Sequence, residues 1–380
     1  MRPASKNLFK LRKANFDGLF NAVKANRYRI IGPKIDSGAI VIKELASVEE
    51  IPRGWIDKQD GGTFRLEKSG DSFFGYVVGP DSLKRFLFPP EKTLWSAERS
   101  GKEINITVKQ DEFPKTALLG VRPCELAAIA IQDKIFTEGE YVDPGYRARR
   151  ENTLLIAVNC TRAGNTCFCL SMGTGPKATS GFDIALTEVG GDAGFFIVES
   201  GSDAGDEIFQ SLSLEPASNK DIENADNAVK AAAQNMGRTL DTSGLPDLLK
   251  SNLDHPRYEK VDSRCLTCGN CTMVCPTCFC STVIDTTDLT GNRSDRIRRW
   301  DSCFNIEHSY IHGGYIRSST MSRYRQWITH KLSSWVDQFG MFGCVGCGRC
   351  ITWCPAGIDI TEEAGAIRKS MKENIKASKG

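Results

Sequence analysis

Two cysteine runs constrain this chain more than any other feature of its sequence. Each run has four cysteines in the spacing C-x2-C-x2-C-x3-C, and a proline follows the fourth cysteine directly. The first run contains Cys265, Cys268, Cys271 and Cys275, and the second contains Cys344, Cys347, Cys350 and Cys354. Gly269 and Gly348 lie where each loop bends sharply, and glycine takes positive φ there without steric cost. Eight of the fifteen cysteines thus belong to one repeated pattern.

This spacing is typical of [4Fe–4S] ligation in bacterial ferredoxins. Three thiolates of a run hold three corners of one cubane, and the fourth thiolate completes the cubane of the other run. We therefore expect two clusters with crossed ligands. Cluster 1 would take Cys265, Cys268, Cys271 and Cys354, and cluster 2 would take Cys344, Cys347, Cys350 and Cys275. Structural zinc is the alternative, but its ligands usually come from two separated knuckles rather than from a closely spaced triplet.

The remaining composition is that of an ordinary globular protein. The 380 residues are 40% hydrophobic and 25% charged, which is enough for two or three cores. A formal net charge of +2 gives no indication of nucleic acid or anionic membrane as a partner. The first twenty residues lack an apolar leader, and no apolar run reaches the length that spans a bilayer. We expect a cytoplasmic protein whose thiolates bind metal rather than form disulfides.

The first half of the chain predicts a sheet with some helix. Apolar spacing indicates a helix over residues 5–29, and short β-type runs follow up to about residue 108, among them FFGYVV at 73–78. Ala117–Val121 and Thr153–Val158 read as buried strands, and a cysteine turn follows each of them. A helical run separates the two strands, which is typical of a parallel pair whose carboxyl ends share one edge.

That edge would gather a second group of cysteines. Cys124 is expected near a helix N-terminus, Cys160 follows the second strand, and Cys167 and Cys169 come within nine residues of Cys160. Four thiolates from two adjacent loops predict a third [4Fe–4S] cluster at this edge. A zinc site is one alternative. The other is that these cysteines are small buried apolar residues, because free cysteine is often buried.

We expect an α+β fold: a sheet-containing N-terminal domain and then a mainly helical, ferredoxin-like domain with two [4Fe–4S] motifs. The predicted divisions are an α+β domain at 1–203 with the possible third cluster, a helical connector at 204–254, and a dicluster domain at 255–380. An insertion of 68 residues separates Cys275 from Cys344. It holds a basic stretch, Arg293–Arg299, and an aromatic-rich run from His308 to Phe339 that reads as helix.

Three further cysteines, Cys278, Cys280 and Cys303, lie in this insertion, one short of a full ligand set. A metal site completed by His308 is one interpretation. Packing around the neighbouring cluster is the favoured one, and the sequence leaves open whether these cysteines bind metal. The arginines of the insertion could face an acidic partner or compensate the cluster charge, but a solvated surface is the usual outcome for such a charge run.

Nucleotide-binding motifs are absent from the sequence. No G-x-G-x-x-G follows a strand, and no G-x-x-x-x-G-K-[ST] occurs, so no flavin, nucleotide or catalytic residue is assigned. A chain with several one-electron centres and no hydride site is expected to conduct electrons between other subunits. Whether it is an enzyme stays uncertain, and a non-catalytic subunit of an oxidoreductase complex is favoured.

From about residue 115 onward the chain resembles the 4Fe–4S dicluster electron-transfer subunits. This family is typified by the beta subunit of cytosolic sulfhydrogenases, which are NAD(P)-linked [NiFe] hydrogenases, and by the electron-transfer subunit of anaerobic sulfite reductase. The matching segments are GVRPCELAAI at 120–129, NC and CFCLSMGTGP within 159–176, RCLTCGNCTMVCPTCFC at 264–280, RYRQWITHKL at 323–332, and GCVGCGRCITWCPAGIDI at 343–360.

The resemblance implies an electron relay inside a complex. Its partners would be a flavin- and NAD(P)-binding diaphorase subunit and a catalytic subunit, either a [NiFe] hydrogenase or a sirohaem sulfite reductase. We expect the hydrogenase complex, with anaerobic sulfite reductase as the alternative. A more distant alternative is a polysulfide-reducing enzyme in its own right, and another is a zinc-stabilised scaffold without a redox role. The sequence does not fix the terminal acceptor, the cluster potentials, the direction of electron flow or the stoichiometry.

Overall fold

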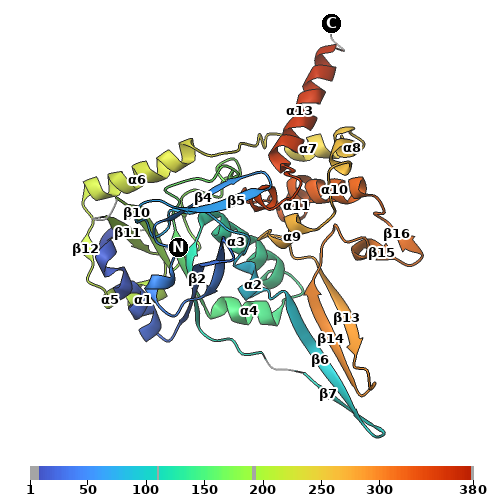
Figure 1. Ribbon diagram of the computed structural model, residues 1–380, viewed down its shortest axis with the longest axis horizontal. Coiled ribbons are helices and arrows are strands. Elements are labelled where there is room, and N and C mark those ends of the chain that lie inside the picture. Colours follow the sequence, from blue (N-terminus) through green and yellow to red (C-terminus); the bar gives the residue numbers. More distant parts are fainter. Residues whose placement is uncertain (1–7, 109–110, 191–193, 378–380) are drawn as a thin grey trace.

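An eight-stranded sheet organises the first part of the molecule (Figure 1). The computed structural model describes residues 8–108, 111–190 and 194–377. The strands lie in the order β12-β1-β11-β10-β9-β8-β2-β3. Their bounds are β1 Leu8–Arg12, β2 Arg29–Asp36, β3 Ala39–Glu44, β8 Thr116–Val121, β9 Thr153–Val158, β10 Ile184–Val189, β11 Phe195–Ser200 and β12 Glu215–Pro216. The four strands β2, β8, β9 and β10 run parallel to one another, and antiparallel strands complete both sides of the sheet.

Helices cover both faces of this sheet. Successive residues of β8 alternate between the two layers, so Leu119 packs in one apolar core and Leu118 in the other. The first core also contains α1 (Phe16–Ala25) and α5 (Asp203–Gln210). The second contains α2 (Lys84–Leu87), α3 (Pro123–Thr137) and α4 (Pro144–Glu151). Burial on both faces explains why the central strands read as almost continuous apolar runs.

The parallel pair expected from the sequence is confirmed. Strands β8 and β9 pair in parallel, with Thr116 opposite Thr153. Their carboxyl ends meet at one edge, where α3 begins with Cys124 in its first turn and Cys160 follows β9. The sheet therefore brings two distant cysteine turns together.

The helix expected over residues 5–29 is largely wrong. Residues 5–7 lie outside the described residues, and Leu8–Arg12 form strand β1 between β11 and β12. Only Phe16–Ala25 form the α-helix α1, after a short 3-10 turn. Pairing on both sides satisfies the backbone of β1, and this tertiary gain outweighs the helical spacing of its apolar side chains.

The FFGYVV run at 73–78 is not a strand, although it is buried. Two buried carboxylates take the backbone hydrogen bonds that a neighbouring strand would otherwise accept. Glu188 accepts from the amides of Phe73 and Phe74, and Asp57 accepts from the amide of Val77 at 2.8 Å. Because its backbone is satisfied in this way, the run passes over the sheet as an irregular buried segment.

Short helices around a separate apolar core form much of the second part of the molecule. They are α7 (Leu245–Lys250), α8 (Arg257–Asp262), α9 (Asn270–Met273), α10 (Thr320–Thr329), α11 (Trp335–Phe339), α12 (Arg349–Thr352) and α13 (Ile360–Ala377). A π-helical segment, His330–Ser334, joins α10 to α11. A helix also lies in the predicted connector, α6 (Asn219–Gln234). The fold is thus a mixture of helices and sheets, as expected, while the three domain boundaries stay a prediction.

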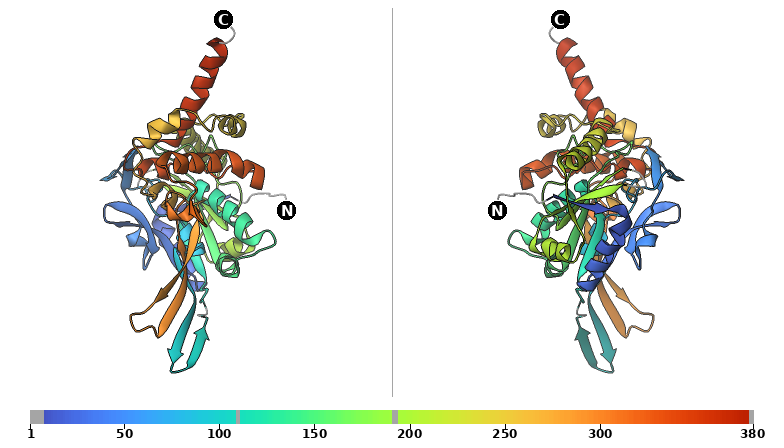
Figure 2. Two further views of the ribbon diagram at one scale, coloured as in Figure 1. Left: turned by 90° about the vertical axis from the view of Figure 1, so that its right-hand side faces the viewer. Right: turned by 90° about the vertical axis from the view of Figure 1, so that its left-hand side faces the viewer.

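A four-stranded sheet joins the two parts of the chain. Its order is β13-β14-β6-β7, with β6 at Glu91–Ser100, β7 at Glu103–Thr107, β13 at Ser281–Thr287 and β14 at Arg293–Trp300. It projects from the body on the side opposite α13 (Figures 1 and 2). The basic stretch Arg293–Arg299 lies on β14, where Arg296 pairs with Asp285 across the hairpin at 2.7 Å, so several of its charges are satisfied within the sheet.

Two smaller hairpins complete the fold. Strands β4 (Trp55–Asp60) and β5 (Thr63–Lys68) pair with each other, and the amide of Gly62 at their turn donates to the carbonyl of Ile351 at 3.1 Å. Strands β15 (Tyr310–Ile311) and β16 (Gly314–Tyr315) form the other hairpin. The helical run expected from His308 therefore begins only at α10, because the Gly313–Gly314 pair forms a hairpin turn instead.

Candidate metal centre

The first cysteine loop follows α8 and surrounds a cavity. Cys265, Cys268 and Cys271 line it, and Cys354 reaches it from the second run. Its apolar walls include Phe304, Tyr324, Trp327 and Ile358. Gly269 has a φ of 76°, and an added Cβ would lie 3.1 Å from the Ser302 hydroxyl oxygen. Glycine is therefore required here for both conformation and space.

The second loop forms a matching cavity at the start of α12. Cys344, Cys347 and Cys350 line it together with Cys275 from the first run. Gly348 has a φ of 77°, and an added Cβ would lie 2.4 Å from the carbonyl oxygen of Thr166. The loop of the N-terminal region that carries Cys167 thus packs directly on the second ligand loop.

Three cysteines of one run and the fourth cysteine of the other line each of these two cavities, and Cys350 of the second run also lines the first cavity. This agrees with the crossed sets expected from the spacing, although iron ligation by these residues stays a prediction. Backbone amides also approach the sulfurs of these sets. The amide of Thr267 lies 3.4 Å from Cys265 Sγ, and the amide of Ile358 lies 3.3 Å from Cys354 Sγ.

A third cavity lies at the edge of the main sheet. Its lining contains all four cysteines of the predicted third set: Cys124, Cys160, Cys167 and Cys169. The empty space around these thiols is about 340 Å³, against about 420 and 320 Å³ in the first and second cavities. Val77, from the irregular FFGYVV segment, and Met236 supply apolar wall.

Burial raises the pKa of most of these thiols in the protein without bound metal. Burial and the neighbouring thiols raise the pKa of Cys271 and Cys350 well above the ordinary thiol value. The same causes raise the pKa of Cys167 to about 12. Four buried thiolates at close range therefore need a positive partner. Iron supplies that charge when it displaces the protons, and soft thiolates suit iron–sulfur clusters.

The three cavities lie in a row. Cys347 lines both the third and the second cavity, and Cys350 lines both the second and the first. The order is therefore third, second, first. We call the end at the first cavity the outer end of the row, because Cys268 is exposed there and Leu266 beside it is 65% exposed.

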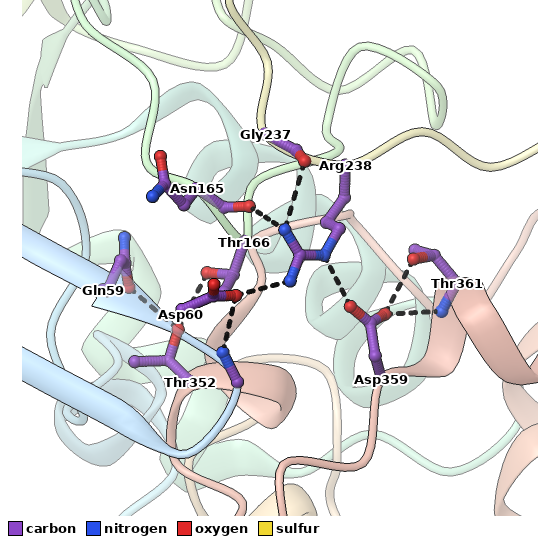
Figure 3. Close-up of polar contacts among 10 residues, drawn as sticks. Gln59, Asp60, Asn165, Thr166, Gly237, Arg238, Thr352, Asp359 and Thr361 are labelled. Atoms are coloured by element: carbon purple, nitrogen blue, oxygen red, sulfur yellow. Dashed lines mark hydrogen bonds and ion pairs between the residues drawn. The ribbon is translucent and has the colours of Figure 1, made fainter.

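A polar network fixes the loop that carries Cys167 and Cys169, here called the third cysteine loop, against the second part of the chain (Figure 3). The Arg238 guanidinium pairs with Asp359 at 2.6 Å and with Asp60 at 2.5 Å, and it donates to the carbonyl of Asn165 at 2.8 Å. One arginine therefore joins the β4–β5 turn, the loop before Cys167 and the segment before α13.

Two buried cations lie beside the cysteine sets. The Arg349 guanidinium forms an ion pair with Glu125, next to Cys347 and Cys124. The Lys331 ammonium lies 3.1 Å from Cys275 Sγ and 3.2 Å from the Thr277 hydroxyl. Positive charge at these places offsets the negative charge of a cluster with four thiolate ligands. Sequence reasoning missed Arg238, Arg349 and Lys331, because no local pattern marks a buried ion pair between distant segments.

The three insertion cysteines line none of the three cavities. The Cys278 thiol is hydrogen-bonded to Cys275, while Cys280 contacts Cys303 and His308. Within the part of the chain that the structure describes, no group of three or more His, Cys, Asp or Glu side chains is placed to hold a single metal ion. All fifteen cysteines are free of disulfides. The described residues also include no helix with the length and apolar character needed to cross a bilayer.

Comparison with known proteins gives two matches. Residues 264–358 match the family described as the 4Fe-4S dicluster domain. The chain is 31% identical over 365 residues to Sulfhydrogenase 2 subunit beta of Pyrococcus furiosus, a match that covers 95% of this chain and 98% of that protein. No solved structure matches the chain significantly. The dicluster match contains both cysteine runs and supports [4Fe–4S] clusters as the cofactor.

Proposed function

The chain belongs to the 4Fe–4S dicluster electron-transfer subunits that include the sulfhydrogenase beta subunit, and on this premise we propose that it relays single electrons through three clusters. Cluster 1 is held by Cys265, Cys268, Cys271 and Cys354, and cluster 2 by Cys344, Cys347, Cys350 and Cys275. Cluster 3 is held by Cys124, Cys160, Cys167 and Cys169. Each cluster stores or releases one electron, and the protein sets its potential through charge, hydrogen bonds and burial.

The observation that carries this proposal is the row of cavities. Cys347 lines the third and second cavities, and Cys350 lines the second and first. No large segment of protein therefore separates one cofactor from the next. Electrons would pass from the sheet edge, through the centre of the molecule, to the exposed Cys268. The chain itself binds and orients the clusters and limits the access of water to them.

The partners of the relay follow from the family. We infer that the electrons come from or go to a flavin- and NAD(P)-binding diaphorase subunit on one side and a [NiFe] hydrogenase subunit on the other, in the cytoplasm. The 31% identity to a sulfhydrogenase beta subunit favours the hydrogenase over a sirohaem sulfite reductase. The chain then acts as a non-catalytic subunit for this reaction.

Iron content tests the three ligand sets. The anaerobically purified chain should contain about twelve iron atoms, and Cys160→Ala and Cys268→Ala should each lose about four. Cys303→Ala is the matched control, because this cysteine lies outside the three cavities, and it should keep all the iron. If Cys160→Ala keeps the full iron content and the full signal of the reduced clusters, the third cluster does not exist at this place.

Throughput tests the relay. In the purified complex, Cys268→Ala should abolish hydrogen-dependent reduction of NAD(P)⁺. Two partial reactions should persist, hydrogen-dependent viologen reduction by the catalytic subunit and NAD(P)H-dependent viologen reduction by the flavin subunit. An unchanged overall rate in a variant shown to lack cluster 1 would exclude this path.

A further inference from the structure

A pair of cysteines outside the three cavities lies where the β13–β14 hairpin begins and ends. Ser281 is opposite Trp300 in the strand register, so Cys280 and Asp301 come next to each other. The amide of Asp301 donates to the carbonyl of Cys280 at 2.8 Å. Cys303 follows two residues later, and its thiol neighbours the Cys280 thiol. The hairpin thus fixes two thiols side by side.

A histidine and a carboxylate complete this group. His308 lies next to Cys280, and its Nδ1 lies 2.6 Å from Asp301 Oδ2. Asp301 is itself held by the amide of Ser302 at 2.7 Å and by the side-chain amide of Asn305 at 3.1 Å. Thiol, imidazole and carboxylate therefore follow one another in the order nucleophile, base and orienting group.

The charges of the group fit a reactive thiolate. The hydrogen bond from Cys303, and then the one from His308, lower the pKa of Cys280 to about 4. The hydrogen bond with Cys280, and then the one with Asp301, raise the pKa of His308 to about 9. The hydrogen bond to the ionised Cys280 raises the pKa of Cys303. At neutral pH one sulfur is thus ionised and its neighbour keeps its proton, as an attacking and a resolving thiol require.

Solvent reaches this group, and the first cavity lies beside it. Cys280, Cys303 and His308 are all partly exposed. The residues on either side of Cys303 contact the first cluster site. Ser302 Oγ lies 2.7 Å from Thr272 Oγ1 in the first cysteine run, and Phe304 lines the first cavity. The thiol pair is therefore next to the outer end of the row of clusters.

We propose that Cys280 and Cys303 form a redox-active dithiol that reduces organic disulfides, R–S–S–R, with electrons from cluster 1. The Cys280 thiolate attacks one sulfur, which breaks the S–S bond, releases RS⁻ and leaves a Cys280–S–S–R mixed disulfide. Cys303 then gives up its proton and attacks Cys280 Sγ, which releases the second RS⁻ and forms a Cys280–Cys303 disulfide. Two electrons, which cluster 1 would supply one at a time when bound, and one proton restore the Cys280 thiolate and the Cys303 thiol, so that R–S–S–R and two electrons give two RS⁻ in all.

His308 is the positioning residue of this site. Its imidazolium stabilises the Cys280 thiolate, and Asp301 fixes the ring so that it faces the thiolate. Cys278 is not part of the pair, because its thiol is hydrogen-bonded to Cys275 at the second cavity. The return of electrons rests on the proposed relay, whereas the attack on the disulfide needs only the thiol pair. The two proposals can therefore fail separately.

Trapping tests the thiol chemistry. The anaerobically purified full chain with its clusters is incubated with glutathione disulfide, digested, and mapped by mass spectrometry. Cys303→Ser should accumulate one glutathione on the peptide that carries Cys280, because the resolving thiol is missing. The wild type should instead contain a Cys280–Cys303 disulfide, and Cys280→Ser should contain neither product. Failure of Cys303→Ser to trap glutathione on Cys280 would overturn the proposal.

Two further measurements separate this site from a metal site and from the relay. Cys280→Ser should keep the full iron content, and a loss of iron would identify Cys280 as a ligand and overturn the proposal. After oxidation, dithionite should restore the dithiol in the wild type but not in Cys268→Ala, which lacks cluster 1. Equal recovery in the two chains would show that the electrons do not pass through the cluster. If glutathione is trapped on Cys280 but the purified complex transfers no electrons from hydrogen to NAD(P)⁺, the result contradicts the relay and leaves the thiol chemistry standing.

Discussion

The ammonium nitrogen of Lys331 lies 3.1 Å from the thiol sulfur of Cys275 in the interior of the protein. The π-helical segment His330–Ser334 places it there, and π-helical turns often occur at functional sites. Gly343 O and the Thr277 hydroxyl also accept from the ammonium, so its position is fixed. A buried positive charge beside a cluster ligand favours the reduced, more negative cluster.

Replacement of Lys331 by methionine should therefore make the midpoint potential of cluster 2 more negative. The stem of the side chain is kept, so the main change is the lost charge and hydrogen bond. A loss of about 1.4 kcal/mol of preference for the reduced state corresponds to a shift of about 60 mV for one electron. Redox titration followed by electron paramagnetic resonance measures the potential of each cluster. The control is Lys250→Met, an exposed lysine paired with Asp337, which should shift none of the potentials.

Arg238 should control the order of the third cysteine loop. Arg238→Met leaves Asp359, which is 2% exposed, without its ion-pair partner and removes the hydrogen bond to Asn165. We expect a loss of about 2–3 kcal/mol of local stability, because a buried carboxylate loses its charged partner. That loss corresponds to faster hydrogen exchange of roughly 30- to 150-fold at the amide of Phe168.

Arg12→Met is the matched control for this change. Arg12 pairs with Glu215 on the surface, with side chains 65% and 48% exposed, so solvent screens the pair and its loss should hardly change stability. Exchange at Phe168 should be unchanged in this variant. Equal exchange in the wild type and Arg238→Met would mean that the network of Figure 3 does not hold the loop.

The cysteine sets could be predicted from sequence because their information is local. Spacing predicted the two crossed groups of four that line the first two cavities but not that Cys350 also lines the first, and the ligation of iron by these groups stays a prediction. The third set needed one tertiary inference, that β8 and β9 are parallel neighbours, and alternating strand and cysteine turn in the sequence supplied it. Each of these inferences rests on a motif or an alternation that repeats visibly along the sequence, even where the partners, such as Cys265 and Cys354, are far apart.

The features that were missed depend on contacts between distant segments. Lys331 meets Cys275 across 56 positions, and Arg349 meets the Gly79 carbonyl across 270. Strand β6 pairs with β14, about 200 positions later in the sequence. From the sequence, the strands of the first half of the chain were expected to form a sheet layer of their own. The FFGYVV segment has a strand pattern, and only the carboxylates of Glu188 and Asp57 explain why it pairs with no strand. No local periodicity reports such partners.

Alkylation at different pH values should reveal the thiolate of Cys280. Its pKa of about 4 lies below the ordinary thiol value, so it is ionised at pH 6 as well as at pH 8. The rate of its reaction with iodoacetamide should therefore be nearly constant between these two pH values. In His308→Ala the imidazolium is lost, the pKa rises, and the rate at pH 6 should fall about tenfold or more relative to that at pH 8. Mass spectrometry of the Cys280 peptide measures the rate, and a steep rise with pH in the wild type would contradict a stabilised thiolate.

Crossed ligation makes a specific prediction about Cys354. This residue belongs to the second run by sequence, yet it lines the first cavity with Cys265. Cys354→Ala should therefore remove the same spectroscopic component as Cys265→Ala, with a loss of about four iron atoms. Cys344→Ala should remove the other component, because Cys344 lines the second cavity with Cys275. The three variants are compared by electron paramagnetic resonance of the dithionite-reduced chain, with the midpoint potential identifying each component. If Cys354→Ala instead removes the component lost in Cys344→Ala, each run binds its own cluster and the crossed assignment is wrong.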